Sequence, residues 1–368
     1  MKHCDKLAVT INPTNRCNLR CDYCMASSAE EQDNPIIINL DFARNGIKDA
    51  IMGYPTGIPV TIIRFFSPGE PTQEMDTMKS CMEYARFLNP HIKTELQTNG
   101  LFKSFEDAKW IADNFEIVWI SLDGPAEIND INRPDKNGQG RTKEIEEYLK
   151  FVLERTSVGV RSTIKPESYH QQKEMVEYYY ELGIMDLAFN PIIYSIERRD
   201  KGQRNVTYGD VMDFSKEFIT AYKRAMELNV YLMNSLTFNF DEPTKIACRS
   251  CVPTPQLNPD GSVSSCDMAL YYDTKEELQC FIYGTWRKKR QKIKYYLEKI
   301  EYLSNRKLAN IPVCKDCKIG PYCAGSCAGR VAYQTGSIYK IIPEYCMATK
   351  YLASKIPLGQ GKMRFTHP

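Results

Sequence analysis

Short apolar runs alternate with longer amphipathic segments over about the first 230 residues of the chain. The apolar runs have the length of buried β-strands, and they are Leu7–Ile11, Ile58–Phe66, Ile92–Gln97, Ile117–Leu122, Val158–Ile164 and Asp186–Pro191. Segments with apolar residues at helical spacing follow them, near residues 41–53, 72–89, 104–114, 142–156, 167–182 and 207–228. Asp41 and Ser104 stand where two of these segments begin, and such short polar residues cap helices. Six β/α repeats predict an α/β fold in which a parallel sheet curls into a partial (β/α)6 barrel like a TIM barrel.

Four loops that directly follow predicted strands are rich in cysteine, glycine and polar residues. They are Cys17–Cys24, Pro68–Pro71, Gln97–Gly100 and Ser121–Pro125. In barrels of this kind, functional groups lie at the C-terminal ends of the strands. The sequence therefore predicts that these four loops meet at one rim and form one site.

The sequence changes character after about residue 240, where cysteines become dense and Gly and Pro are frequent. We predict a barrel domain over residues 1–235, a cysteine-rich domain over 236–350 and a C-terminal tail over 351–368. Long helical periodicity persists in this half mainly in residues 285–308. The basic run 287–294 could be a nucleic-acid patch, but nearby acidic residues favour a solvated helix face.

Length and composition narrow the class of protein without naming a partner. The 368 residues exceed the usual size of one domain, and 43% hydrophobic and 26% charged residues are ordinary for a globular protein. A net charge of +2 gives no general attraction to nucleic acid or to anionic membranes. The N-terminus has no apolar signal-peptide core, and no run is long enough to span a membrane. We therefore expect a cytoplasmic protein with no nucleic-acid or membrane partner.

The chain has 14 cysteines but only four widely separated histidines. In a long chain without a signal peptide, this cysteine content favours metal or cluster ligation over a disulfide framework. The spacing C-x3-C-x2-C in Cys17–Cys24 brings three thiolates into one small volume. A structural zinc site takes four protein ligands, whereas a [4Fe–4S] cluster held by three thiolates keeps one iron open. The alternatives are three unrelated cysteines or a zinc knuckle that lacks a ligand.

This segment resembles the cluster loop of the radical SAM enzymes, in which S-adenosylmethionine (SAM) chelates the open iron through its methionine end. The resemblance implies that Cys17, Cys21 and Cys24 hold the cluster and that Tyr23 lies beside the adenine. When bound, this pair of cofactors supplies a 5′-deoxyadenosyl radical, and the protein positions the substrate.

Other segments resemble the parts of these enzymes that contact SAM or the substrate. Pro68-Gly69-Glu70-Pro71 is similar to the glycine/glutamate/proline motif, which implies that Glu70 and the backbone at Gly69 hold the methionine amino group. The family usually has two glycines there, and Pro68 replaces the first. The resemblance assigns a further set of residues to the methionine carboxylate, the ribose or the substrate: Asn99, Ser121, Asp123, Arg161 and Ser162. An acidic turn and polar strand ends would also suit any other α/β protein.

The cysteines of the second half have the order Cys248-x2-Cys251-x9-Gly261-x4-Cys266, Cys314-x2-Cys317-x5-Cys323-x3-Cys327 and Cys346. This order is similar to the seven-cysteine pattern of the SPASM domain, with one extra cysteine. The resemblance implies two auxiliary [4Fe–4S] clusters without an open iron, one held by Cys248, Cys251, Cys266 and Cys327, the other by Cys314, Cys317, Cys323 and Cys346. Two zinc ribbons are the alternative. Cys4, Cys81 and Cys280 remain as buried or incidental thiols, with Cys280 an alternative ligand in place of Cys248 or Cys251.

Nearly the whole chain resembles anaerobic sulfatase maturases and related peptide-modifying SPASM enzymes. The resemblance implies an oxidoreductase that abstracts a hydrogen atom from a residue of a peptide or protein and oxidises or cross-links it. It also implies a flavodoxin- or ferredoxin-type electron donor or acceptor. Asp267, directly after Cys266, has the position of the aspartate that takes a substrate proton in the maturases. A carboxylate that only neighbours the cluster or the surface is the alternative.

Two other functions stay open from the sequence. One is a radical SAM dehydrogenase that acts on a small molecule or in cofactor biosynthesis, and the other is a non-catalytic zinc-binding interaction protein. The first predicted strand begins within ten residues of Met1, so we expect no separate leader-binding domain in front of it. The substrate then binds the barrel mouth directly or arrives with a partner.

Overall fold

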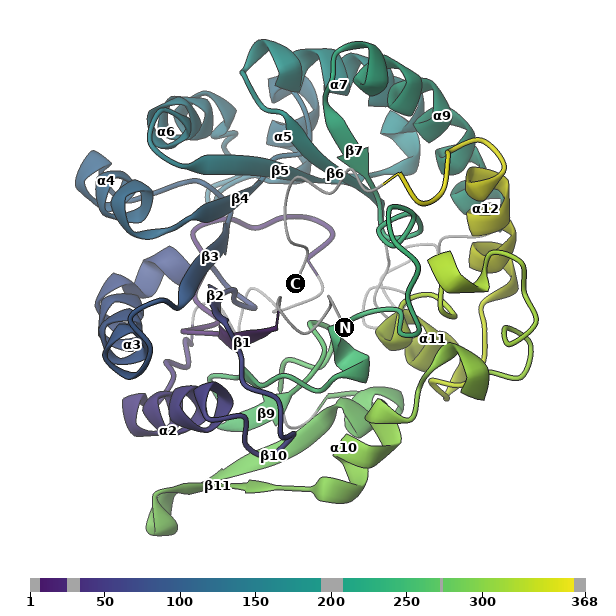
Figure 1. The fold of residues 1–368 in the computed structure, drawn as a ribbon. Helices are drawn as coiled ribbons and strands as arrows, with labels where there is room; N and C mark the ends of the chain where they lie inside the picture. Colours follow the sequence, from purple (N-terminus) through teal and green to yellow (C-terminus); the bar gives the residue numbers. More distant parts are fainter. Residues whose placement is uncertain (1–6, 25–33, 193–207, 272–273, 361–368) are drawn as a thin grey trace.

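The computed structural model describes residues 7–24, 34–192, 208–271 and 274–360. Its centre is a sheet in which seven strands stand in sequence order and each pairs in parallel with the next. They are β1 (Ala8–Ile11), β2 (Ile62–Phe65), β3 (Lys93–Thr98), β4 (Ile117–Ser121), β5 (Ser157–Ile164), β6 (Asp186–Pro191) and β7 (Tyr231–Met233). The expected α/β fold with a curled parallel sheet is confirmed (Figure 1). The seventh strand was not expected, because a run of three residues is too short to recognise in the sequence.

Six helices cover the outside of the curled sheet, one after each of the strands β1 to β6 (Figure 1). They are α2 (Leu40–Ile51), α3 (Met75–Leu88), α4 (Phe105–Asn114), α6 (Thr142–Leu153), α7 (Gln172–Glu181) and α9 (Tyr208–Glu227), with a short helix α5 (Ala126–Asn132) that the sequence did not predict. Ser104 caps α4 as expected, since its hydroxyl accepts a hydrogen bond from Asp107 N. Asn39 rather than Asp41 caps α2, and Asp41 lies in the first turn.

The cysteine-rich half of the chain continues the same sheet beyond β1. Four strands extend it in the order β11-β10-β9-β8-β1: β8 (Gln256–Leu257), β9 (Ser262–Ser264), β10 (Ile282–Arg287) and β11 (Lys292–Tyr295). The helices of this half are α10 (Leu297–Ser304), α11 (Ala328–Thr335) and α12 (Pro343–Ala353), and α12 packs against α9. The domain boundaries stay a prediction, but one eleven-stranded sheet runs through both regions.

Short 3-10 helices connect several of these elements. They are η2 (Pro71–Glu74), η3 (Pro166–Gln171), η4 (Arg249–Cys251), η5 (Glu276–Phe281), η6 (Lys288–Arg290), η7 (Leu308–Asn310) and η8 (Gly320–Tyr322). Within the part of the chain that the structure describes, no helix has the length and apolar character needed to cross a membrane.

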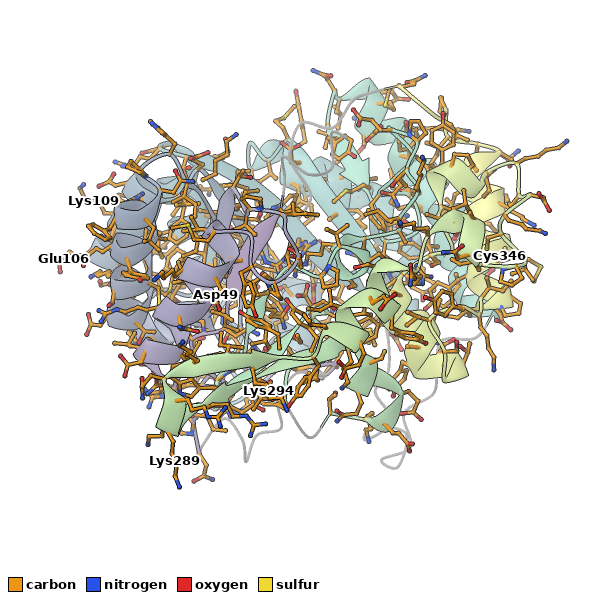
Figure 2. All side chains as sticks on the ribbon, turned by 60° about the horizontal axis from the view of Figure 1, so that its bottom comes forward. Asp49, Glu106, Lys109, Lys289, Lys294 and Cys346 are labelled. Carbon is orange, nitrogen blue, oxygen red and sulfur yellow. The ribbon has the colours of Figure 1, made fainter. Side chains whose placement is uncertain are left out.

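The expectation of a helix over residues 285–308 is wrong before residue 297. Residues 282–295 form the β10–β11 hairpin, and only α10 keeps the helical pattern. The reason is a period of two in β11, where Ile293 is buried between the exposed Lys292 and Lys294. The basic run is therefore the end of a hairpin and not a helix face, and Figure 2 shows Lys289 at its tip.

The interior of the barrel holds charged residues below the rim. Arg64 of β2 lies opposite Glu95 of β3 in the strand register, and each side chain is only 2% exposed. Arg161 of β5 donates a hydrogen bond to Gln97 of β3 at 2.6 Å. Burial lowers the pKa of Arg64 to about 10 and raises the pKa of Glu95. The apolar core therefore lies between the sheet and the outer helices, while the space inside the sheet is polar.

Candidate active site

The loop after β1 carries the first three cysteines of the predicted site. Cys17, Cys21 and Cys24 are all partly buried, and electrostatic interactions connect Cys17 with the other two. Burial raises the pKa of Cys17 and raises that of Cys21 to about 12. Because burial disfavours a lone thiolate, three such sulfurs in one place suit a positively charged metal centre that stabilises them as ligands.

The loop after β2 holds the cysteine loop from one side. Gly69 lies so close to it that a Cβ there would stand 2.1 Å from the carbonyl oxygen of Arg16. The backbone N–H of Glu70 donates to that same carbonyl at 2.7 Å. Ser67 donates a further hydrogen bond to the carbonyl of Thr14. Only glycine fits at position 69, which explains the one glycine that the sequence keeps in this motif.

Glu70 is 2% exposed and accepts four hydrogen bonds. Its Oε1 accepts from Thr72 N at 3.1 Å, Thr72 Oγ1 at 2.8 Å and Thr98 Oγ1 at 2.7 Å. Its Oε2 accepts one hydrogen bond among the described residues, from Asn99 N at 2.7 Å. Burial raises the pKa of Glu70, and these donors oppose the rise. The carboxylate is thus fixed in orientation, with a lone pair of Oε2 open to a cationic group.

The loop after β3 contacts the cysteine loop through Asn99. Its Nδ2 donates to Asn18 Oδ1 at 2.7 Å and lies 3.9 Å from the sulfur of Cys17. Asn18 in turn donates to the carbonyl of Leu101 at 2.8 Å. Asn99 therefore positions the cysteine loop, whichever ligand it also contacts.

The segment after β4 holds the other end of the cysteine loop. Tyr23 donates to Asp123 Oδ2 at 2.6 Å, and Arg133 Nη1 donates to the Tyr23 hydroxyl at 2.6 Å. Asp123 also accepts from Thr163 N at 2.8 Å. Burial raises the pKa of Asp123, although Arg133 and Tyr23 lower it. The structure places Asp123 behind Tyr23, where it fixes the aromatic ring.

A cavity of about 400 Å³ opens between these four loops. Nearly all of the residues predicted for the SAM site line it: Cys17, Cys21, Cys24, Tyr23, Gly69, Glu70, Asn99, Ser121, Arg161 and Ser162. Asp123 is the one predicted SAM residue that does not line it. The hydroxyl of Ser162 already donates its hydrogen bond within the protein, to the Leu122 carbonyl at 2.7 Å.

Another cavity, of about 380 Å³, lies between α9, β7 and residues 356–360 and has no cysteine in its wall.

Four further residues of the wall, Pro68, Pro71, Gln97 and Thr98, belong to the loops that were predicted to form the site. The wall residues that the sequence did not predict are Phe66, Ser67, Arg133, Thr163, Asn190, Pro191, Ile192 and Arg330. Thr163 and Asn190 stand at the ends of β5 and β6, so the strand-end rule could have found them. Arg330 belongs to α11 in the second half of the chain, and no motif around it indicates that it reaches the cavity. Its Nη1 donates to Ser235 Oγ at 3.0 Å.

Eight of the nine cysteines of the second half lie in two groups. Electrostatic and hydrogen-bond interactions connect Cys248 with Cys251, Cys266 and Cys327. A second set of interactions connects Cys314 with Cys317, Cys323 and Cys346. The grouping is the one that the resemblance implies, and ligation itself stays a prediction. Figure 2 shows Cys346 of α12 far from the β10–β11 hairpin.

The three groups contain three, four and four cysteines. One open-iron and two closed four-iron clusters would take these numbers of thiolates. Within the described ranges, no three His, Cys, Asp or Glu side chains are arranged to hold one metal ion.

Two of the three leftover cysteines, Cys81 and Cys280, lie in the described residues. Cys81 is buried in α3, and burial raises its pKa to about 12. Cys280 lies near Lys299, and burial raises its pKa to about 11. Cys280 also packs against the apolar cluster that contains Cys251 and Cys266, and its role as a replacement ligand stays a prediction. Cys4 lies outside the described residues.

Asp267 lies beside the barrel interior and not in the wall of the cavity. Its Oδ1 accepts hydrogen bonds from Arg64 Nη2 at 2.9 Å and from Arg249 Nη2 at 2.6 Å. Burial raises the pKa of Asp267, but Arg249 and Arg64 outweigh it and lower the pKa to about 2. A carboxylate held in this way is a weak proton acceptor until a substrate displaces one of the guanidinium groups.

Part of the chain matches a model of a known protein family. Residues 11–179 match the family model of the Radical SAM superfamily. A cysteine-type anaerobic sulfatase-maturating enzyme of Clostridium perfringens is 23% identical over 87% of this chain and 88% of its own length. An Fe-coproporphyrin III synthase of Methanosarcina barkeri is 29% identical over 52% of this chain and 45% of its own length. A Methanocaldococcus jannaschii protein, MJ0907, is 29% identical over 52% of this chain, which spans only 62% of that relative's length.

Solved structures share the fold over nearly the whole chain. The structure of anSMEcpe with bound AdoMet has a TM-score of 0.74 at 20% identity and covers 95% of this chain and 96% of its own. Streptococcus suis SuiB bound to the precursor peptide SuiA has a TM-score of 0.64 at 17% identity and covers 94% of this chain and 77% of its own. At these identities the likeness shows a common fold, which includes the cysteine-rich half.

Proposed function

Because residues 11–179 form a radical SAM domain, we propose that this protein is an enzyme that cleaves SAM and abstracts a hydrogen atom from a residue of a peptide or protein substrate. One observation carries the proposal: Cys17, Cys21 and Cys24 lie in the wall of the same cavity as Glu70 and Arg161. Three thiolates leave one iron of a four-iron cluster open, and this cavity gives that iron a place for SAM and substrate.

Each residue of the cavity has a proposed role that its contacts support. Cys17, Cys21 and Cys24 hold the cluster, and Glu70 accepts a hydrogen bond from the methionine amino group through its open lone pair. Ser121 and Arg161 are donors available to a carboxylate or a ribose. Asn99 and Asp123 are proposed to position other residues of the site, since Asn99 fixes the cysteine loop and Asp123 fixes the ring of Tyr23.

The two cysteine groups of the second half are proposed to hold auxiliary [4Fe–4S] clusters. Eight thiolates fill two such clusters and leave no iron open, so these clusters would carry electrons rather than bind SAM. A flavodoxin- or ferredoxin-type protein is the proposed electron donor or acceptor.

A peptide or protein is the proposed substrate, for two reasons. The C. perfringens relative, whose name is that of a sulfatase-maturating enzyme, aligns over both halves of the chain and not only over the SAM domain. SuiB, which shares the fold, was solved with a precursor peptide. Asp267 is proposed as the base that takes the substrate proton, with displacement of Arg64 or Arg249 as a required step.

A small-molecule substrate is a second candidate function. The M. barkeri synthase, named for a porphyrin product, is as identical as any relative described above, although it aligns over only half of this chain. The two candidates differ in which compound stimulates formation of 5′-deoxyadenosine by the reduced enzyme. Peptides and small molecules tested side by side would separate them.

The proposal is tested by metal content and SAM cleavage together. Anaerobically reconstituted protein should bind about twelve irons and twelve sulfides per chain, as three four-iron clusters require. With dithionite and SAM it should form 5′-deoxyadenosine. Stoichiometric zinc without SAM cleavage would overturn the proposal in favour of a zinc-binding interaction protein. About four irons with SAM cleavage would refute only the assignment of the auxiliary clusters.

A further inference from the structure

Arg306 is a buried cation in the middle of the cysteine-rich half. It follows α10 and is only 1% exposed. Its guanidinium donates to the carbonyls of Ile338 at 2.6 Å, Gly325 at 2.7 Å, Ser326 at 3.2 Å and Ala324 at 3.5 Å. Its remaining contact is the sulfur of Cys251, 3.8 Å from Nη1. No carboxylate of the described residues is among these acceptors, so the charge is balanced by carbonyl dipoles and a cysteine sulfur.

Three of these carbonyls belong to a loop with an unusual backbone. Ala324, Gly325 and Ser326 have φ values of 49°, 82° and 64°, all in the left-handed region. Two of the three are not glycine, and such residues adopt this region only where the surroundings hold them there. A left-handed turn points its carbonyls in one direction, and here they point at Arg306.

The same loop joins the two cysteine groups. It runs from Cys323, which belongs to the second group, to Cys327, which belongs to the first. The backbone N–H groups of Gly325 and Ser326 lower the pKa of Cys323 through hydrogen bonds. The loop therefore offers its amides to one group of sulfurs and its carbonyls to Arg306.

The charge of Arg306 lies close to both groups. Its Nη1 is 3.8 Å from the sulfur of Cys251 in the first group. Its Nη2 donates to the carbonyls of Gly325 and Ser326, which are the second and third residues after Cys323 of the second group. The guanidinium is thus placed between the two groups by contacts to both sides of the loop that joins them.

We propose that Arg306 is a positioning residue that couples the two auxiliary sites, by fixing the loop that joins them and by placing one positive charge between them. This inference rests on the proposed function in one respect, the binding of iron–sulfur clusters by the two cysteine groups. A fixed positive charge favours the reduced form of a cluster, which carries one more electron, so Arg306 raises the reduction potential of both clusters. Because the site is buried, solvent screens this effect little.

The test compares anaerobically reconstituted full-length variants by iron content and by redox titration with EPR detection. Arg306→Gln removes the charge and part of the hydrogen bonding, while Arg306→Lys keeps the charge. Lys299→Gln is the matched control, because Lys299 is a partly buried cation that donates to the carbonyls of Gln279 and Ile282 and lies near Cys280, which belongs to neither group of four cysteines. The midpoint potentials of both auxiliary clusters should fall in Arg306→Gln, and they should stay near the wild-type values in Arg306→Lys and Lys299→Gln.

Each other outcome has one meaning. If Arg306→Gln loses about eight irons and keeps about four, both auxiliary sites depend on Arg306 and the coupling stands. A loss of about four irons, or a potential shift of one auxiliary cluster only, would overturn the coupling. Unchanged potentials, or an equal fall in Arg306→Lys, would overturn the role of the charge. Wild-type protein without auxiliary clusters would instead refute the proposed function, and its iron content shows this before any variant is made.

Discussion

Tyr23 donates a hydrogen bond of 2.6 Å to Asp123, so a residue of the cysteine loop after β1 is joined to the loop after β4. Arg133 completes the contact from the other side with a hydrogen bond of 2.6 Å to the same hydroxyl. The phenol therefore lies between a carboxylate and a guanidinium, both buried. This arrangement fixes the ring in the cavity wall between Cys21 and Cys24 before any ligand binds.

Tyr23→Phe should weaken SAM binding by about ten-fold and lower the free energy of unfolding by about 1–3 kcal/mol, the usual cost when a buried charged group loses its partner. Iron content should stay at the wild-type level, because no cysteine changes. Equilibrium binding of SAM and denaturant unfolding measure the two effects. Tyr178→Phe is the control, since its hydroxyl donates to Glu146 at 2.6 Å away from the site. Equal SAM affinity in the two variants would contradict the role of Tyr23.

Gly69→Ala should reduce SAM cleavage at least ten-fold, because its Cβ would stand 2.1 Å from the carbonyl oxygen of Arg16 and would push the two loops apart. The accompanying loss of stability should be about 1–3 kcal/mol, as for other overpacked sites. Formation of 5′-deoxyadenosine under dithionite measures the activity. Gly57→Ala serves as the comparison, because a Cβ at Gly57 meets no atom within 4 Å but its φ of 77° strains an alanine. That variant should therefore lose stability and keep SAM cleavage. Normal cleavage by Gly69→Ala would show that the close approach is not needed.

Replacement of Cys17, Cys21 and Cys24 together by Ala should abolish reductive SAM cleavage and leave roughly eight irons bound, as two intact four-iron clusters require. The cysteines of the second half lie in separate groups, so their clusters should form without the first one. Cys280→Ala should keep all irons and full activity, because each group of the second half has four cysteines without Cys280. Continued 5′-deoxyadenosine formation by the triple variant would refute the central assignment.

Asp267→Asn should lower product formation by about 10²-fold or more, the usual scale for loss of a general base. Hydrogen abstraction, read as deuterium transfer from labelled substrate into 5′-deoxyadenosine, should survive, since Asp267 lies outside the cavity wall. The measurement compares both readouts in one reaction. Wild-type product yield would leave Asp267 as a structural partner of Arg64 and Arg249. Equal loss of both readouts would indicate damage to the neighbouring cluster.

The parallel barrel could be predicted from the sequence because short strand-like runs alternate six times with segments of helical spacing. The runs that became β1 to β6 were found within a few residues of their observed ends. β7 and α5 were not predicted, because three and seven residues are too few to show the spacing of apolar positions typical of a strand or a helix. The β10–β11 hairpin was mistaken for a helix because its charged turn and the amphipathic α10 follow each other without a Gly or Pro between them.

The convergence of loops on one rim could also be predicted, since it follows from strand direction alone. The sequence could not reveal that Arg330 of α11 reaches the same cavity, because that placement depends on how the two halves pack. Nor could it reveal the two guanidinium groups around Asp267, since Arg64 and Arg249 are far from it in different elements. Motif spacing finds residues within one loop, but contacts between loops need the fold.

The pairing of β8 with β1 has a consequence for any attempt to isolate the barrel. Thr10 N donates to the Pro255 carbonyl at 2.8 Å and Asn12 N donates to the Leu257 carbonyl at 3.0 Å. A fragment that ended at residue 235 would lose these acceptors and expose β1 as an apolar edge strand. Unprotected edges of this kind pair with edges of other molecules, so the fragment should aggregate rather than fold as a smaller enzyme. The cysteine-rich half thus keeps the sheet of the barrel closed to other chains on the β1 side.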